Sequence, residues 1–145
     1  MPFRFTLASV LRFRESIENR EEVSLKRLQL EVRRVRGRID ELTDEMARAW
    51  QERERALEQT IQANRLQTVQ LEINAAAEAK KILLETMLTL KCERDAQMKT
   101  YQVAHRGRQM LTDLLTQKRS EYEQEQARRE QKMLDDVVAA RWQRS

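Results

Sequence analysis

The residue types that could do chemistry in this chain are few and scattered. His105 is the only histidine and Cys92 the only cysteine, so they provide neither a metal-ligand set nor an intramolecular disulfide. The many carboxylates could serve general acid–base catalysis only where their surroundings perturb their pKa values, and carboxylates on exposed helix faces stay solvated. No glycine loop for phosphate is present. We therefore predict that the protein is not an enzyme and has no cofactor or metal site.

The elements that would position these residues are long helices. The chain contains two glycines, Gly37 and Gly107, and one proline, Pro2, so it lacks the residues that make most tight turns. Its 36% of charged residues and 5% of aromatic residues are typical of a coiled coil or a long helix. This composition excludes a compact domain of many elements, and it indicates helices that dock on partners.

Apolar residues recur with the alternating three- and four-residue spacing of a coiled coil. A first stripe begins at Leu25 and weakens after Ala49, and a second begins at Ile73 and continues in the same rhythm to Tyr122. Several positions of the second stripe are polar or charged: Lys80, Arg94, Gln97, Arg108 and Lys118. Such residues lower stability and help to select the register or the partner.

We predict an all-α fold, a long two-helix antiparallel coiled-coil hairpin that forms a single domain over residues 1–145. The first helix would cover about residues 3–63, the reversal would lie somewhere in 62–74, and the second helix would cover about 68–142. Asn64 could end the first helix and Thr68 could cap the second. One unbroken helix in a parallel dimer is the alternative, because no glycine or proline marks the bend.

Charge supports a reversal near residue 72. Residues 39–64 hold seven acids and three bases, and residues 80–108 hold seven bases and three acids. A bend near residue 72 would lay these two stretches side by side, and opposite flanks favour antiparallel pairing. The same bend would bring Phe3 and Phe5 near Val138 and Trp142. It would also place Gly37 opposite Gly107.

The overall charge indicates solvated helix faces. The formal net charge is +4, from 28 basic and 24 acidic residues that are interleaved along the chain. Residues 1–38 hold ten bases and five acids, so a basic helix that binds nucleic acid is a second functional class. Aromatic residues for base stacking are scarce, and we expect no nucleic-acid partner. No window is apolar enough for a membrane span and the N-terminus has no uncharged signal core, so we expect a cytoplasmic protein.

Both ends of the chain carry short motifs. The N-terminus has the pattern F-x-F-x-L-x-x-V-L, formed by Phe3, Phe5, Leu7, Val10 and Leu11. The C-terminal segment has a basic residue followed by two acids and an apolar residue: Lys132, Asp135, Asp136 and Val137. With these motifs, its length and its expected hairpin, the sequence resembles the flagellar FliJ family of type III export. It departs from the family at residues 71–77, where relatives often have more aromatic residues.

The resemblance implies a non-enzymatic stalk and escort protein, similar to the central stalk of a rotary ATPase. Its partners would be the flagellar export ATPase hexamer, the export gate in the membrane and export chaperones. It would lie in the cytoplasm, peripherally associated with the inner membrane at the flagellar base. The candidate residues at the ATPase end are Phe3, Phe5, Leu7, Leu11, Arg14, Lys132, Asp135 and Asp136. The equivalent stalk of a virulence-type secretion system and a coiled-coil scaffold unrelated to export remain open.

The residues alone leave two roles open for the N-terminal aromatics. Phe3 and Phe5 could anchor a partner, since buried aromatics dominate interface energies, or they could cap the hairpin. Trp50 and Leu57 lie outside the apolar stripes and are candidates for a second docking face.

Overall fold

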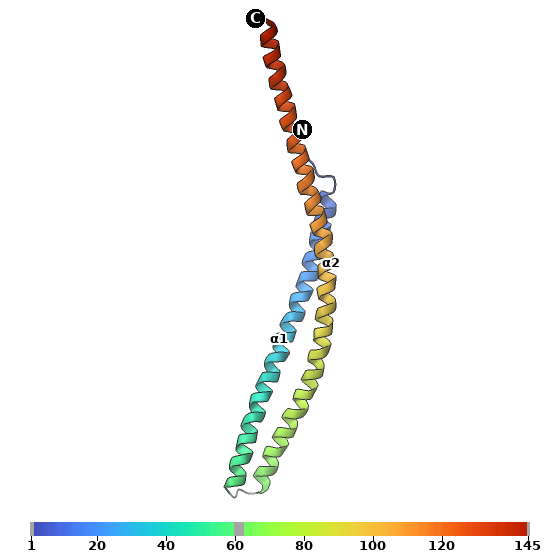
Figure 1. Ribbon diagram of the computed structural model, residues 1–145. Helices are drawn as coiled ribbons and strands as arrows, with labels where there is room; N and C mark the ends of the chain where they lie inside the picture. Colours follow the sequence, from blue (N-terminus) through green and yellow to red (C-terminus); the bar gives the residue numbers. More distant parts are fainter. Residues whose placement is uncertain (1, 60–62, 145) are drawn as a thin grey trace. The chain divides into compact units, whose positions relative to one another are not determined.

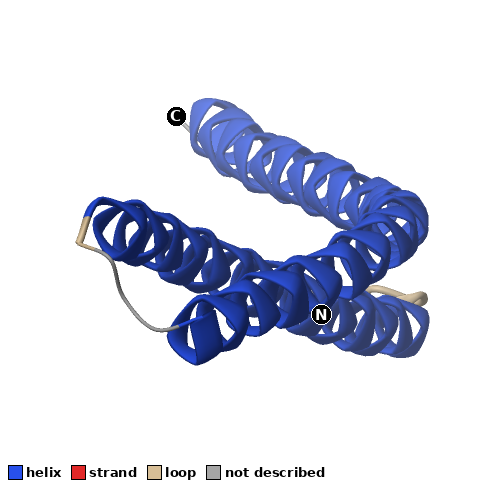
Figure 2. Cartoon of the chain, turned by 90° about the horizontal axis from the view of Figure 1, so that it is seen from below, coloured by secondary structure: helices blue, strands red, loops and turns tan. Residues whose placement is uncertain are grey.

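The computed structural model describes residues 2–59 and 63–144, and nearly all of these are helical. Helix α1 spans Ala8–Glu58 and helix α2 spans Ala63–Arg144, and the described residues include no strand (Figures 1 and 2). The two helices pack against each other with opposite chain directions. The predicted all-α helical hairpin is therefore confirmed.

Helix α1 begins later than predicted, at Ala8 instead of residue 3. The backbone N–H of Ala8 donates to the carbonyl oxygen of Phe5 at 3.1 Å, which forms the turn that leads into the helix. Residues 2–5 are not helical. Their aromatic side chains fold onto α2 instead, and burial of this apolar surface compensates for the helical hydrogen bonds that are lost.

The predicted position of the reversal is wrong for residues 63–74, which belong to α2. The remaining residue of the predicted range, residue 62, lies outside the described residues. Thr68 does not cap the second helix: it lies within α2, and its hydroxyl donates to the carbonyl oxygen of Asn64 at 3.0 Å. The reason is that the apolar contact between the helices extends further than the stripes suggest, through Ala56 and Val69, which are both 2% exposed.

The chain divides into two compact units, which we call the inner unit (Glu21–Tyr101) and the terminal unit (Met1–Arg20 with Gln102–Ser145). In the inner unit, Arg65 pairs with Glu52 at 3.3 Å, and the Gln97 amide donates to the Glu21 carboxylate at 2.6 Å. These two contacts show that the register is antiparallel. The buried residues of this unit are Leu25, Val32, Leu42, Ala56, Val69, Ile73 and Met87.

This register does not match the charges as predicted. In the inner unit the acidic stretch 39–58 lies beside residues 63–79, which hold two acids and one base, as the contact between Glu52 and Arg65 shows. The basic stretch 80–101 lies beside residues 21–38, which hold six bases and three acids. The apolar contact sets the register instead, because exposed ion pairs contribute only about 0–1 kcal/mol each.

Candidate partner-binding site

The N-terminal segment of the terminal unit is held on α2 by aromatic contacts. The ring of Phe3 lies 5.5 Å from the ring of Tyr122, at an interplanar angle of 53°. The guanidinium of Arg119 lies 5.6 Å from the centre of the Phe3 ring, within the range of a cation–π contact. Phe3, Phe5 and Leu7 are all half-buried. The prediction that Phe3 and Phe5 lie near Val138 and Trp142 is therefore wrong, because the reversal comes earlier than residue 72.

A hollow of about 420 Å³ remains between this segment and α2. On the α2 side it is lined by Leu114, Lys118 and Tyr122. On the other side it is lined by the whole segment: Pro2, Phe3, Arg4, Phe5, Thr6 and Leu7. Because the lining is largely apolar, the segment covers apolar surface at the end of the contact between the two helices.

Leu11 and Arg14 fix the first turns of α1 against α2. Leu11 is 8% exposed, and its backbone N–H donates to the Leu7 carbonyl oxygen at 2.9 Å. The Arg14 side chain crosses α2 at Gly107, where a Cβ atom would lie 3.5 Å from Nη1 of Arg14. Gly107 thus lies beside Arg14, and not opposite Gly37 as predicted.

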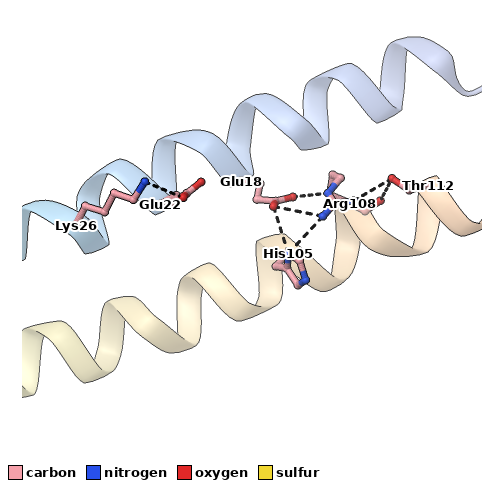
Figure 3. A network of polar contacts seen from close by, with 6 residues as sticks. All are labelled: Glu18, Glu22, Lys26, His105, Arg108 and Thr112. Carbon is pink, nitrogen blue, oxygen red and sulfur yellow. Dashed lines mark hydrogen bonds and ion pairs between the residues drawn. The ribbon is translucent and has the colours of Figure 1, made fainter. Parts of the chain in front are cut away.

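A polar network joins the two helices at Glu18 (Figure 3). The Glu18 carboxylate accepts a hydrogen bond from Nε of Arg108 at 2.5 Å and contacts Nδ1 of His105 at 3.2 Å. Arg108 also donates to the hydroxyl of Thr112 at 3.2 Å. Only 13% of the Glu18 side chain and 20% of the Arg108 side chain are exposed, so this ion pair is largely enclosed.

The network changes the acidity of Glu18. The hydrogen bond from Arg108 lowers the pKa of the Glu18 carboxyl below its usual value, and contact with His105 acts in the same direction. Partial burial opposes the shift, but the pKa is lowered on balance. Glu18 is therefore an anionic link between the helices.

The C-terminal segment of α2, residues 127–144, is exposed along its whole length. It contains Lys132, Asp135 and Asp136, and Asp135 accepts a hydrogen bond from Gln131 at 3.1 Å. Lys132 is ten positions beyond Tyr122, about 15 Å along the helix, so the structure does not bring it against Phe3. Five large apolar side chains on this segment are more than half exposed: Met133, Leu134, Val137, Val138 and Trp142.

The exposed apolar side chains share one side of the helix. Leu134, Val138 and Trp142 follow one another at intervals of four residues, and Met133 and Val137 form the neighbouring row. We call these five residues the C-terminal apolar stripe. The stripe is therefore a candidate docking surface.

Sequence reasoning missed four residues of the terminal unit: Glu18, Arg108, Arg119 and Tyr122. Arg108 and Tyr122 occupy positions of the second apolar stripe, so a charged residue and an aromatic residue at such positions were the available signals. Nothing in the spacing indicated Glu18 or Arg119. Trp50 and Leu57, the predicted second docking face, are 43% and 60% exposed, and Trp50 contacts the Arg53 guanidinium at 5.0 Å.

The described residues offer no group of three His, Cys, Asp or Glu side chains that could hold a metal ion. Within the same residues, neither helix has a stretch apolar enough to cross a membrane. Comparison with protein families gives a match over residues 3–145 to the family described as Flagellar FliJ protein. No curated protein and no solved structure matches the chain.

Proposed function

Because the chain belongs to the flagellar FliJ protein family and is thereby a component of flagellar protein export, we propose that it is a non-enzymatic stalk that binds the export ATPase. In this proposal the terminal unit engages the ATPase hexamer and promotes its assembly. The flagellar family match is what favours this role over a virulence-type stalk or an unrelated scaffold.

The C-terminal apolar stripe is the observation that carries the proposal. Its five side chains lie at the helical intervals with which an amphipathic helix inserts into a groove or pore, and the chain itself leaves them exposed. Lys132, Asp135 and Asp136 lie on the same segment and provide charges beside the stripe. We propose these residues as direct contacts.

The N-terminal candidates have a different role in this proposal. Leu11 is buried against its own chain, and Phe3, Phe5 and Leu7 are half-buried on α2. They position the terminal unit, while Arg14 is the N-terminal candidate that is still exposed. Of the two roles that the sequence left open for Phe3 and Phe5, we favour the cap.

The test is ATP hydrolysis by the cognate flagellar export ATPase, with and without the chain, together with the fraction of ATPase in hexamers. We expect the full chain to raise both. The double variant Leu134→Ser, Val138→Ser should lose most of the stimulation, because it removes two adjacent members of the stripe. Both residues are exposed, so helix content should not change.

Met110→Ser is the matched control. Met110 is 72% exposed, lies on the same helix and in the same unit, and is outside the stripe. It should stimulate the ATPase like the unchanged chain. Equal stimulation by the stripe variant would exclude the stripe as the binding site, and no stimulation by the full chain would exclude the stalk role.

We further propose the export gate and export chaperones as partners, and a place in the cytoplasm at the flagellar base. The family match supports these partners and this location only because it makes the chain a flagellar protein. Pull-down of the gate protein's soluble part by the full chain tests the first of these partners.

A further inference from the structure

One face of α1 in the inner unit points away from α2 and is centred on a glycine. Val32 and Leu42 are 4% and 3% exposed on the side that contacts α2, and helical geometry places Gly37 on the opposite side. A Cβ atom built on Gly37 would meet nothing within 4 Å. Nothing in the described part of the chain therefore explains a glycine in the middle of this helix, where it lowers helix stability.

Charges change sign at this glycine. Arg33 and Arg34 precede it by one turn, and Asp40 and Glu41 follow it by one turn. Glu41 pairs with Arg38 at 3.0 Å. Within the described residues, the side chains of Arg33, Arg34 and Asp40 make no hydrogen bond or ion pair. We call Arg33, Arg34, Asp40 and Glu41, together with Val23, Leu30, Gly37 and Asp44, the Gly37 face.

The Gly37 face is complementary to itself. Consider an antiparallel pair of α1 helices that cross at Gly37. On one side of the crossing, the residue three positions before the glycine meets the residue four positions after it in the other copy. On the other side, the residue four positions before the glycine meets the residue three positions after it. Arg34 of one copy then meets Glu41 of the other, and on the opposite edge Arg33 meets Asp40. The twofold axis repeats both pairs, which gives four pairs of opposite charge.

A parallel arrangement lacks this complementarity. It would place each arginine beside the same arginine of the second copy, and each acid beside the same acid, which repels. The apolar residues on this face also favour a protein partner: Val23 and Leu30 are 57% and 55% exposed and precede Gly37 at intervals of seven residues.

We propose that two copies of the chain associate antiparallel through the Gly37 face. The glycine lets the two backbones approach closely at the crossing point, and the four charge pairs fix the direction. This association goes beyond the proposed stalk role, because its residues belong to the inner unit and the ATPase candidates belong to the terminal unit.

Sedimentation velocity of the full chain at low salt, over a range of concentrations, tests the proposal. We expect a monomer–dimer equilibrium that shifts toward monomer as salt rises. Gly37→Leu should raise the dissociation constant about tenfold or more, because a side chain now fills the crossing point. Ala96→Leu adds bulk at an exposed position of α2, outside this face, and should leave dimerisation unchanged; circular dichroism checks that both variants stay helical.

Charge reversal gives a second, independent test. The variant Arg33→Glu, Arg34→Glu and the variant Asp40→Lys, Glu41→Lys should each be monomeric, because all four pairs become like-charged. An equimolar mixture should dimerise again, since each acid of one variant then meets a base of the other. Loss of association that the mixture does not restore would overturn the pairing, as would a chain that is monomeric at every concentration.

Cysteine cross-linking reports the direction. In a Cys92→Ser background, Gly37→Cys should form a disulfide-linked dimer on oxidation, since the two positions meet at the axis. Gln51→Cys, exposed and about 21 Å along α1, should not, because its copies lie far apart in an antiparallel pair. Equal cross-linking at both positions would indicate a parallel pair and overturn the proposal.

Discussion

Single residues of the terminal unit decide how firmly its two helices are joined, and Glu18 is the most informative of them. Its carboxylate binds Arg108 and His105 across the interface with little exposure. Hydrogen bonds to charged groups contribute about 1.5–3 kcal/mol, and removal of one partner leaves the other charge poorly solvated. The sequence alone shows Glu18 only as one acid among many.

We predict that Glu18→Gln lowers the free energy of unfolding by about 1–2 kcal/mol at neutral pH. The pKa of Glu18 is lowered in the folded chain, so its contribution is present above the unfolded pKa of about 4.3 and is lost as pH falls through the folded pKa. Urea titrations at neutral and at strongly acidic pH should therefore show a difference between variant and unchanged chain that disappears in acid.

Glu22→Gln is the control for this experiment. Glu22 pairs with Lys26 at 3.0 Å one turn away on the same helix, and the two side chains are 39% and 70% exposed. Such a pair is worth about 0.3–0.5 kcal/mol, so the variant should change stability little at either pH. An equal loss of unfolding free energy in both variants would mean that the Glu18 network stabilises the fold no more than an exposed ion pair does.

At the scale of the elements, the sequence predicts the two helices but not their register. The lack of turn residues and the heptad spacing are local properties, and both helices follow from them. The register depends on which small residues are buried between the helices, and Ala56 and Val69 gave no clear apolar signal. The predicted bend lay several residues too far along the chain. In an antiparallel pair, each predicted partner is then displaced by twice that number of residues, so Phe3 was expected beside Trp142 instead of Tyr122.

For the candidate site, as for the helices, the sequence predicts the segments but not how their side chains are oriented. The end motifs pointed to the segments that we propose as partner-binding, but only the structure shows that Phe3 and Leu11 pack inward while Lys132, Asp135 and Asp136 stay exposed. Inward or outward orientation depends on the register, so it could not follow from spacing alone.

Gly107 allows a prediction about α2. A Cβ atom at this position would lie 3.5 Å from the Arg14 side chain, an ordinary van der Waals distance, and alanine favours helix over glycine by up to about 1 kcal/mol. Gly107→Ala should therefore raise the free energy of unfolding by about 0.5–1 kcal/mol, measured by urea titration. Gly107→Leu, which displaces Arg14, should not give this gain. A loss of stability in the alanine variant would show that the crossing of Arg14 tolerates no side chain.

At the scale of the whole molecule, the two proposed surfaces belong to different units and can be separated by experiment. The C-terminal segment has no tertiary packing in the described chain, and a lone helix of this length is only marginally stable in water. The inner unit buries apolar residues from both helices along its length. Amide hydrogens should therefore exchange faster in residues 127–144 than in the helices of the inner unit.

Hydrogen exchange with and without the export ATPase then tests the division of roles. Binding should slow exchange in residues 127–144, because the ATPase orders the segment, and should leave residues 33–44 unchanged. The Gly37→Leu variant should show the same protection, since its substitution lies in the inner unit. Protection of residues 33–44 by the ATPase, with none in the C-terminal segment, would mean that the Gly37 face binds the ATPase and that the C-terminal apolar stripe does not.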